Sequence, residues 1–283
     1  MVGTLYIVGT PIGNLEDVTM RALRVLREVD LIAAEDTRRT ARLLQHYSIA
    51  TPTTSLHEHN ERGKSPHLVR KLQDGLSIAV VSDAGMPLVS DPGAVLVRAA
   101  REAGVPVQVV PGPSAVTAAL AGAGISGPFA FVGFPPSSGR ERTAWFDSIG
   151  RMTAQMPVVF FEAPHKVQRT LTKLVSLLGD RPIIQARELT KVFETLAEQP
   201  ISALASGSER PRGEFVFILP HFVPEPTIPS ADQAQETSAR MLVDFREMTN
   251  KGAKPRAAAK ALAPRYGLPA GEIYRLCLTD REN

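Results

Sequence analysis

Short apolar runs alternate with longer amphipathic segments through the first 110 residues. The segments repeat their apolar positions with a helical period, and the runs between them, bounded by turn residues, cover positions 5–8, 29–34, 78–81 and 107–110. This alternation predicts an α/β fold with a parallel sheet covered by helices. In such folds, ligands bind at the carboxyl ends of the strands, where the loops lie.

A second series of apolar runs follows, with helical segments between its members, which cover positions 129–134, 157–162, 182–188 and 213–220. Two such series favour two α/β domains, because one domain is commonly about 100–150 residues long. We place an N-terminal domain with the parallel sheet at residues 1–115 and a C-terminal α/β domain at residues 116–222.

Prolines dominate the stretch after the last run. Their spacing from Pro220 to Pro229 is incompatible with a regular helix, so we predict a Pro-rich linker at residues 223–236. Residues 237–283 are predicted to form a small helical module, with two helices separated by a turn at 266–269. The pair is either a helix-turn-helix or a hairpin that packs on the body or on a second subunit, and the sequence leaves both open.

Composition places the chain among ordinary globular proteins. Hydrophobic residues make up 43% of the chain and charged residues 22%, and no apolar run approaches the length that spans a bilayer. The N-terminus lacks a basic leader, and the single cysteine, Cys277, cannot form an intrachain disulfide. We therefore expect a cytoplasmic protein that is not integral to a membrane.

Positive charge is concentrated at the C-terminal end. The net charge is +3, yet residues 251–283 alone carry seven basic residues against three acidic ones. Such a segment favours a polyanionic partner such as nucleic acid, although solvated lysines are the commoner explanation.

Three Gly- and Pro-rich loops follow predicted strands, at residues 9–15, 82–93 and 111–114. Because each follows a strand of the same predicted sheet, we expect them to converge on one edge. The second loop is longer than a simple connection needs, and its backbone, held by Pro87 and Pro92, is suited to bind a small molecule. The first loop lacks the spacing of ATP or NAD motifs, and a tight structural turn explains it equally well.

Two polar clusters have competing explanations. Charged residues around Asp36 suit substrate handling, but Asp36 or Thr37 as the N-cap of a helix explains them equally well. The cluster at residues 57–61 places His57 and His59 on one face if it is a strand. A third metal ligand with recognisable spacing is lacking, so we predict a polar surface and no metal site.

Taken together, these stretches resemble the tetrapyrrole methylase superfamily of S-adenosylmethionine-dependent enzymes, and within it the ribosomal RNA small subunit methyltransferase I family. The resemblance covers almost the whole chain. It is carried by the segments 9–15, 34–38, 56–61, 82–93, 111–115, 160–165 and 187–191.

The resemblance implies a tetrapyrrole methylase-like fold, in which two α/β domains clasp the cofactor, and a dimer. It implies methylation of the ribose 2′-oxygen of a cytidine in the decoding region of 16S rRNA, on free rRNA or the small ribosomal subunit. It also assigns cofactor contacts to Pro11, Asp83, Ala84, Gly85, Pro87, Val89, Ser90, Ser114, Ala115 and Phe161.

Two positions depart from the family pattern. Met86 stands where relatives carry Asp or Thr, which removes a side-chain role there but leaves backbone contacts. Phe193 stands where relatives often place His.

A ribose hydroxyl is a very weak acid, so a nearby group is expected to accept its proton during methyl transfer. The candidates are Asp36, Glu188 and Lys191, each in a polar motif that follows a strand. Two other functions remain open, namely a tetrapyrrole C-methyltransferase and a non-catalytic ribosome-binding protein.

Overall fold

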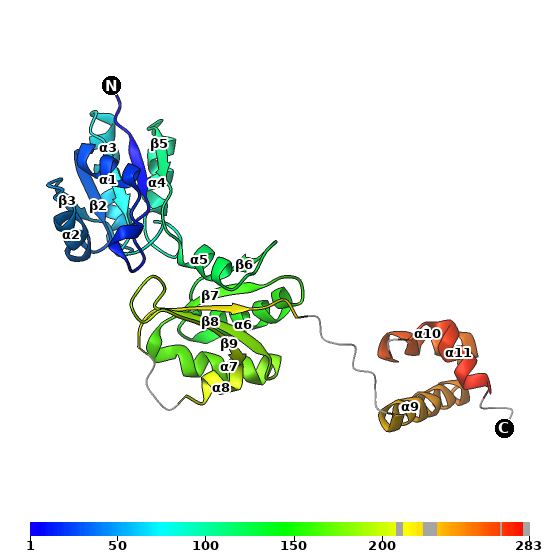
Figure 1. Ribbon diagram of the computed structural model, residues 1–283. Helices are drawn as coiled ribbons and strands as arrows, with labels where there is room; N and C mark the ends of the chain where they lie inside the picture. The colour runs from blue at the N-terminus through cyan, green and yellow to red at the C-terminus, as the bar shows by residue number, and fades with distance from the viewer. Residues whose placement is uncertain (208–211, 223–230, 267, 280–283) are drawn as a thin grey trace. The chain divides into compact units, whose positions relative to one another are not determined.

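The computed structural model describes residues 1–207, 212–222, 231–266 and 268–279, and the chain divides into two compact units, Met1–Val223 and Pro224–Asn283. The first unit contains two five-stranded sheets, in the orders β3-β2-β4-β1-β5 and β6-β7-β10-β8-β9 (Figure 1).

The first sheet is entirely parallel. Its strands are β1 (Leu5–Val8), β2 (Leu31–Ala34), β3 (Thr53–Ser55), β4 (Ile78–Val81) and β5 (Val107–Val110). Its helices are α1 (Met20–Glu28), α2 (Thr37–His46), α3 (Glu61–Gln73) and α4 (Ala94–Glu102), with a 3₁₀ turn, η1 (Leu15–Asp17). Separate hydrophobic cores form against the two faces, so both faces are covered. The predicted parallel sheet is confirmed, with β3 as an added short strand.

The second sheet is mixed. Strands β6 (Ala130–Phe131) and β7 (Val158–Glu162) are parallel, whereas β8 (Pro182–Arg187), β9 (Thr195–Pro200) and β10 (Phe215–Leu219) join through antiparallel pairs. One face packs on helix α5 (Ala115–Gly122). The other packs on α6 (Gly139–Thr153), α7 (Val167–Leu178) and α8 (Ile201–Ala205), around the stacked rings of Phe160 and Phe217. The 3₁₀ turn η2 (Pro164–Lys166) follows β7.

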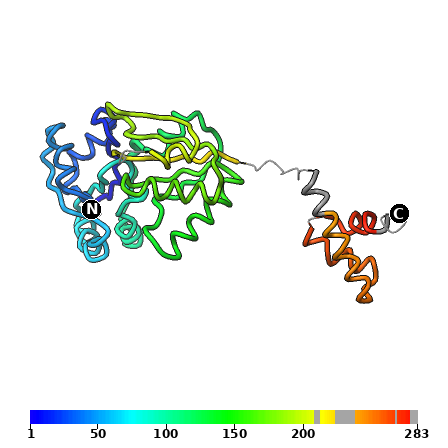
Figure 2. Tube along the Cα trace, turned by 90° about the horizontal axis from the view of Figure 1, so that it is seen from below, coloured from blue at the N-terminus to red at the C-terminus, as the bar shows by residue number. Residues whose placement is uncertain are grey.

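The described part of the second unit is a bundle of three helices, α9 (Ala231–Asn250), α10 (Pro255–Tyr266) and α11 (Ala270–Thr279) (Figure 2). Its core includes Met241, Phe245 and the buried Cys277. Helix α9 begins inside the range that the sequence assigns to a linker, because the prolines end at Pro229 and helix-forming residues follow. Residues 223–230 of that range lie outside the described residues.

Across the described part of the chain, no helix combines the length and apolar character needed to cross a membrane.

Candidate functional site

The three Gly- and Pro-rich loops meet at the carboxyl edge of the first sheet, as the sequence predicts. Thr10 donates its backbone N–H to Gly85 O at 2.9 Å, and Gly85 N donates back to Thr10 O at 3.1 Å. The backbones of Gly9 and Gly112 touch, since a Cβ atom on Gly112 would lie 2.8 Å from Gly9 Cα. The ends of β1, β4 and β5 are therefore joined by direct backbone contact.

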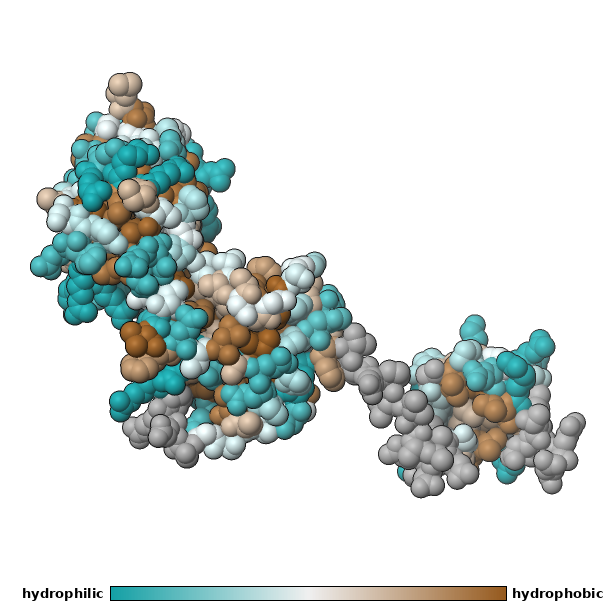
Figure 3. All heavy atoms as spheres, viewed as in Figure 1, coloured by the Kyte–Doolittle hydropathy of each residue, from teal (hydrophilic) through white to brown (hydrophobic). Residues whose placement is uncertain are grey.

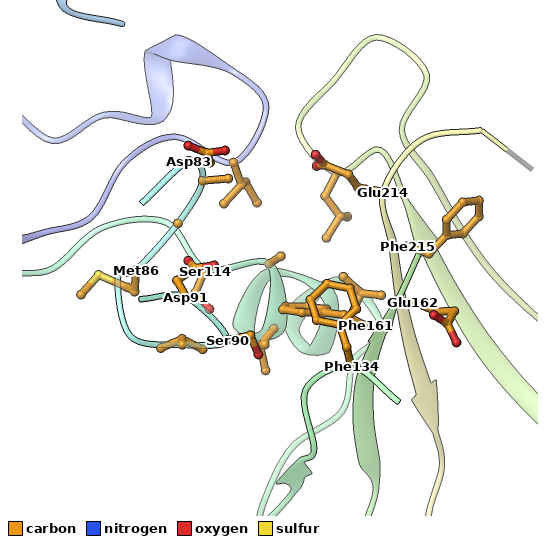
Figure 4. A pocket seen from close by; sticks show the side chains of 18 of the residues that line it. Asp83, Met86, Ser90, Asp91, Ser114, Phe134, Phe161, Glu162, Glu214 and Phe215 are labelled. Carbon is orange, nitrogen blue, oxygen red and sulfur yellow. The ribbon is translucent and has the colours of Figure 1, made fainter. Parts of the chain in front are cut away.

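A cavity of about 390 Å³ opens between these loops and the second sheet (Figure 4). This volume falls in the range of small-molecule sites. Its walls include most of the residues assigned to the cofactor by resemblance, namely Asp83, Ala84, Gly85, Val89, Ser90, Ser114, Ala115 and Phe161. Pro11 and Pro87 are buried, and neither is among the lining residues.

Aromatic rings form the wall on the side of the second sheet. Phe161 on β7 and Phe134 after β6 have ring centroids 5.3 Å apart, and Phe134 is half exposed. Figure 4 places both rings on the opposite side of the cavity from Asp83. They give the cavity a flat apolar surface on which a planar ring can pack.

Carboxyl groups dominate the polar part of the wall. Glu35, Asp83 and Asp91 all line the cavity, together with the guanidinium of Arg39, whose Nε lies 3.4 Å from Asp83 Oδ2. Burial raises the pKa of Glu35. Burial, followed by the charge of Glu35, raises the pKa of Asp91 to about 6, against a hydrogen bond with Ser82. Neighbouring carboxylates repel one another when ionised, and a positive charge between them relieves that repulsion. The cavity therefore favours a positively charged ligand.

Replacing Asp91 with Asn is expected to stabilise the protein at high pH. A carboxyl whose folded pKa is raised costs stability as pH rises through that pKa, whereas an amide does not titrate. Because Asp91 is only half buried, we expect the stability of Asp91→Asn relative to wild type to rise by about 1 kcal/mol between pH 4.5 and pH 8, which corresponds to about 2–4 °C in Tm. Thermal unfolding of Asp91→Asn and wild type at both pH values measures it, with the exposed Asp147→Asn as control. A difference in Tm that does not change with pH would contradict the assignment.

Two of the three proposed proton acceptors lie together beside the cavity wall. Lys191 Nζ is 2.9 Å from Glu188 Oε1 and 3.2 Å from Glu214 Oε2, and Glu214 lines the cavity. The hydrogen bond from Lys191 lowers the pKa of Glu188. Burial opposes the charge of Lys191, but the hydrogen bond and charges of Glu188 and Glu214 outweigh it and raise the pKa of Lys191. Lys191 therefore acts as a cation at neutral pH.

Asp36, the third candidate, is the N-cap of α2. Its Oδ1 accepts the Arg38 backbone N–H at 2.8 Å, and its Oδ2 lies 2.8 Å from the Arg38 guanidinium. These hydrogen bonds lower the pKa of Asp36 well below its usual range. The N-cap explanation is confirmed for this residue. Neither Asp36, Glu188 nor Lys191 is among the residues that line the cavity.

The cluster at residues 57–61 forms a turn leading into α3, so the strand considered for it is wrong. Asn60 Oδ1 accepts the His57 backbone N–H at 2.9 Å, and the rings of His57 and His59 have centroids 6.0 Å apart. Within the described ranges, His, Cys, Asp and Glu side chains form no group of three that could hold a metal ion.

The two departures from the family pattern have different settings. The Met86 side chain packs with the core under the first sheet and points away from the cavity in Figure 4, so its backbone forms the wall. Phe193 is 78% exposed and is not among the lining residues. Phe193 is one of several exposed large apolar side chains of the first unit. The face of that unit seen in Figure 3 carries several apolar patches.

Glu35 and Arg39, from the charged cluster around Asp36 that the sequence connects with substrate handling, line the cavity, whereas no role was assigned from sequence to Asp91, Phe134 and Glu214. Asp91 stands in the loop that the sequence predicts to bind a ligand, so a signal was present for it. Phe134 and Glu214 come from the second sheet, and nothing in the local sequence connects them with the first.

By sequence, this chain is similar to proteins named as methyltransferases. The sequence profile of the Tetrapyrrole (Corrin/Porphyrin) Methylases matches residues 4–205. The ribosomal RNA small subunit methyltransferase I of Vibrio cholerae is 48% identical over 221 residues, which is 76% of each chain. That of Synechocystis sp. is 41% identical over 280 residues, which is 98% of each chain.

Solved structures share the fold of the first unit. Uroporphyrin-III C-methyltransferase from Thermus thermophilus matches with a TM-score of 0.57 at 19% identity, over 77% of this chain and 97% of that chain. A diphthine synthase matches with a TM-score of 0.61 at 15% identity, over 79% and 92%. The predicted tetrapyrrole methylase-like fold is confirmed.

Proposed function

The chain belongs to the ribosomal RNA small subunit methyltransferase I family of the tetrapyrrole methylases, and from this we propose that it methylates small-subunit ribosomal RNA with S-adenosylmethionine as methyl donor. The acceptor is the ribose 2′-oxygen of a cytidine in the decoding region of 16S rRNA. The observation that carries the proposal is the 41% identity with a ribosomal RNA methyltransferase over 98% of both chains.

The cavity fits S-adenosylmethionine in size and chemistry. The rings of Phe134 and Phe161 offer a surface for adenine, and the carboxyl groups of Glu35, Asp83 and Asp91 suit a ligand with positive sulfonium and ammonium groups. We propose that the contacts come from Asp83, Ala84, Gly85, Val89, Ser90, Ser114, Ala115 and Phe161, with Pro11 and Pro87 supporting the loops from behind.

When bound, this cofactor supplies an activated methyl group, so the protein mainly has to align the attacking oxygen. The joined loops of the first sheet hold one wall, and β7 and β10 hold the other. Asp36 and Glu188 remain the proposed acceptors of the ribose proton. Lys191 is held as a cation between Glu188 and Glu214. We propose that it orients the Glu188 carboxylate and attracts the RNA backbone.

We further propose a homodimer in the cytoplasm, on the basis of the family resemblance and an RNA substrate. We also keep residue 115 as the boundary between two α/β domains, since it lies where the first sheet ends and α5 begins. Light scattering on the purified protein measures the oligomeric state.

The second unit is proposed to bind RNA phosphates. Exposed basic side chains stand just before α10 and in its first half, at Lys254, Arg256 and Lys260. Deleting residues 224–283 should weaken RNA binding and reduce the slope of log Kobs against log salt by about 2–4, because each phosphate contact contributes about 0.7–0.9.

A full-length variant with Lys254→Ala and Lys260→Ala serves as the matched control for that deletion. It keeps the helical bundle, and we expect it to lower the salt slope by about 1–2. Titration of labelled RNA at several salt concentrations gives both slopes. A slope unaltered by the deletion would assign the second unit to dimerisation or packing.

Transfer of labelled methyl groups tests the proposed function. The protein is incubated with labelled S-adenosylmethionine and either undermethylated small ribosomal subunits or uroporphyrinogen. Label in the RNA supports the proposal, and label in uroporphyrinogen would instead identify a tetrapyrrole C-methyltransferase. Cofactor binding without transfer to either substrate would contradict the proposal and favour a non-catalytic ribosome-binding protein.

A further inference from the structure

Glu61, the first residue of α3, holds the start of α4 through a single carboxylate oxygen. Its Oε1 accepts backbone N–H groups from Val95 at 2.7 Å, Gly93 at 2.9 Å and Leu96 at 3.3 Å. The residue is only 7% exposed. Glu61 is the last residue of the polar cluster at residues 57–61, and the proposed methyl transfer assigns no role to that cluster.

Helix α4 has no capping side chain of its own. Its N-cap is Gly93, whose φ of +125° is strained for any residue with a side chain, and a Cβ there would lie 3.0 Å from Leu88 Cδ1. The first amides of a helix need an acceptor, usually the N-cap side chain. Glu61 supplies this acceptor from a different helix, and its negative charge also suits the positive end of the helix dipole.

The loop at residues 82–93 is thereby fastened at both ends. At its beginning, the Thr10 hydroxyl donates to Ser82 O at 3.2 Å, and the backbones of Thr10 and Gly85 exchange two hydrogen bonds. At its end, Glu61 holds Gly93. Between these two attachments lie Val89, Ser90 and Asp91, which line the cavity.

We propose that Glu61 is a positioning residue that sets the geometry of the cavity loop and so controls affinity for the cofactor. This inference rests on the proposed function for the identity of the ligand. The carboxylate does not line the cavity and acts through the backbone of Gly93, which lies two residues after Asp91.

A merely structural role predicts a different outcome. If Glu61 only stabilised the fold, any substitution with the same loss of stability would affect the cofactor equally. Leu72→Ala provides this comparison, because Leu72 is fully buried near the end of α3, whereas Glu61 is the first residue of that helix.

The experiment compares Glu61→Ala, Glu61→Gln and Leu72→Ala with wild type. Calorimetric titration with S-adenosylmethionine should give a Kd about 10- to 100-fold weaker for Glu61→Ala, since the charged acceptor of three backbone N–H groups is lost. The Glu61→Gln protein keeps an acceptor oxygen, and its Kd should stay within about threefold of wild type. Hydrogen exchange of the free protein should show faster exchange at residues 82–96 in Glu61→Ala alone.

Each result decides the inference. Equal weakening in Leu72→Ala, or unchanged affinity and exchange in Glu61→Ala, would overturn the role of Glu61. If wild type binds no S-adenosylmethionine, the proposed function fails, while the exchange measurement still decides whether Glu61 holds the loop.

Discussion

Replacing Gly112 with alanine is expected to abolish cofactor binding and to destabilise the first unit. The new Cβ would lie 2.8 Å from Gly9 Cα, 2.9 Å from Gly9 C and 3.0 Å from Gly9 O, all of them backbone atoms that cannot rotate away. Strands β1 and β5 must then separate at the edge where the three loops meet. Because overpacking of a well-packed site costs about 1–3 kcal/mol and backbone clashes more, we expect a loss of about 3 kcal/mol, or about 6–12 °C in Tm.

Gly63→Ala is the matched control for this substitution. Gly63 lies in α3, and apart from its chain neighbours and the nearby backbone of the helix no atom lies within 4 Å of the added Cβ. Alanine should therefore leave stability unchanged or raise it by about 0.5–1 kcal/mol. Thermal unfolding and calorimetric titration with S-adenosylmethionine measure both effects. A Gly112→Ala protein that binds the cofactor as wild type does would show that the close approach of the loops is not needed for the site.

Alanine at Glu188 is expected to lower kcat about a hundredfold while leaving the cofactor Kd within about threefold, because general base catalysis contributes about 10²–10⁴ in rate. The same substitution at Lys191 should act similarly, since Lys191 Nζ contacts Glu188 Oε1. Residues that act as one unit are not additive, so the double variant should resemble the stronger single variant. Asp36→Ala should lower kcat less, because strong hydrogen bonding to Arg38 weakens Asp36 as a base.

Glu198→Ala is the control for this series. Glu198 is an exposed carboxylate on β9 of the same sheet and is not among the cavity-lining residues, so kcat should not change. Single-turnover rates of methyl transfer at saturating cofactor separate chemistry from binding. Unchanged rates in the Asp36→Ala and Glu188→Ala variants would remove both residues as proton acceptors, and an unchanged rate in Lys191→Ala would remove its role in orienting Glu188.

The parallel sheet was predictable because its central strands are buried on both faces. Strand β4, with the sequence Ile-Ala-Val-Val, is buried at every position and so stands out as a continuous apolar run. Strands β3 and β9 lie at sheet edges. Strand β3 consists of Thr and Ser only, and β9 is almost entirely exposed with Glu and Gln among its residues, so neither forms an apolar run. The antiparallel pairing of β10 was equally hidden, since apolar runs carry no information on strand direction.

The candidate site was predictable only in part for a similar reason. The loop at residues 82–93 can be recognised in the sequence from its Gly and Pro content and from its place after a buried strand. Phe134 and Glu214 complete the cavity from the second sheet, and only the three-dimensional packing brings them there. The support that Glu61 gives to Gly93 spans 32 residues and has no local pattern at all.

The position of the transferred methyl group tests the central claim most directly. Small-subunit RNA labelled by the protein with S-adenosylmethionine is digested completely with alkali, which cleaves only next to a free ribose 2′-hydroxyl. The proposed function predicts label in an alkali-resistant dinucleotide whose first nucleoside is cytidine, and no such label with the Gly112→Ala protein. Label recovered entirely in mononucleotides would place the methyl group on a base and contradict ribose 2′-O-methylation.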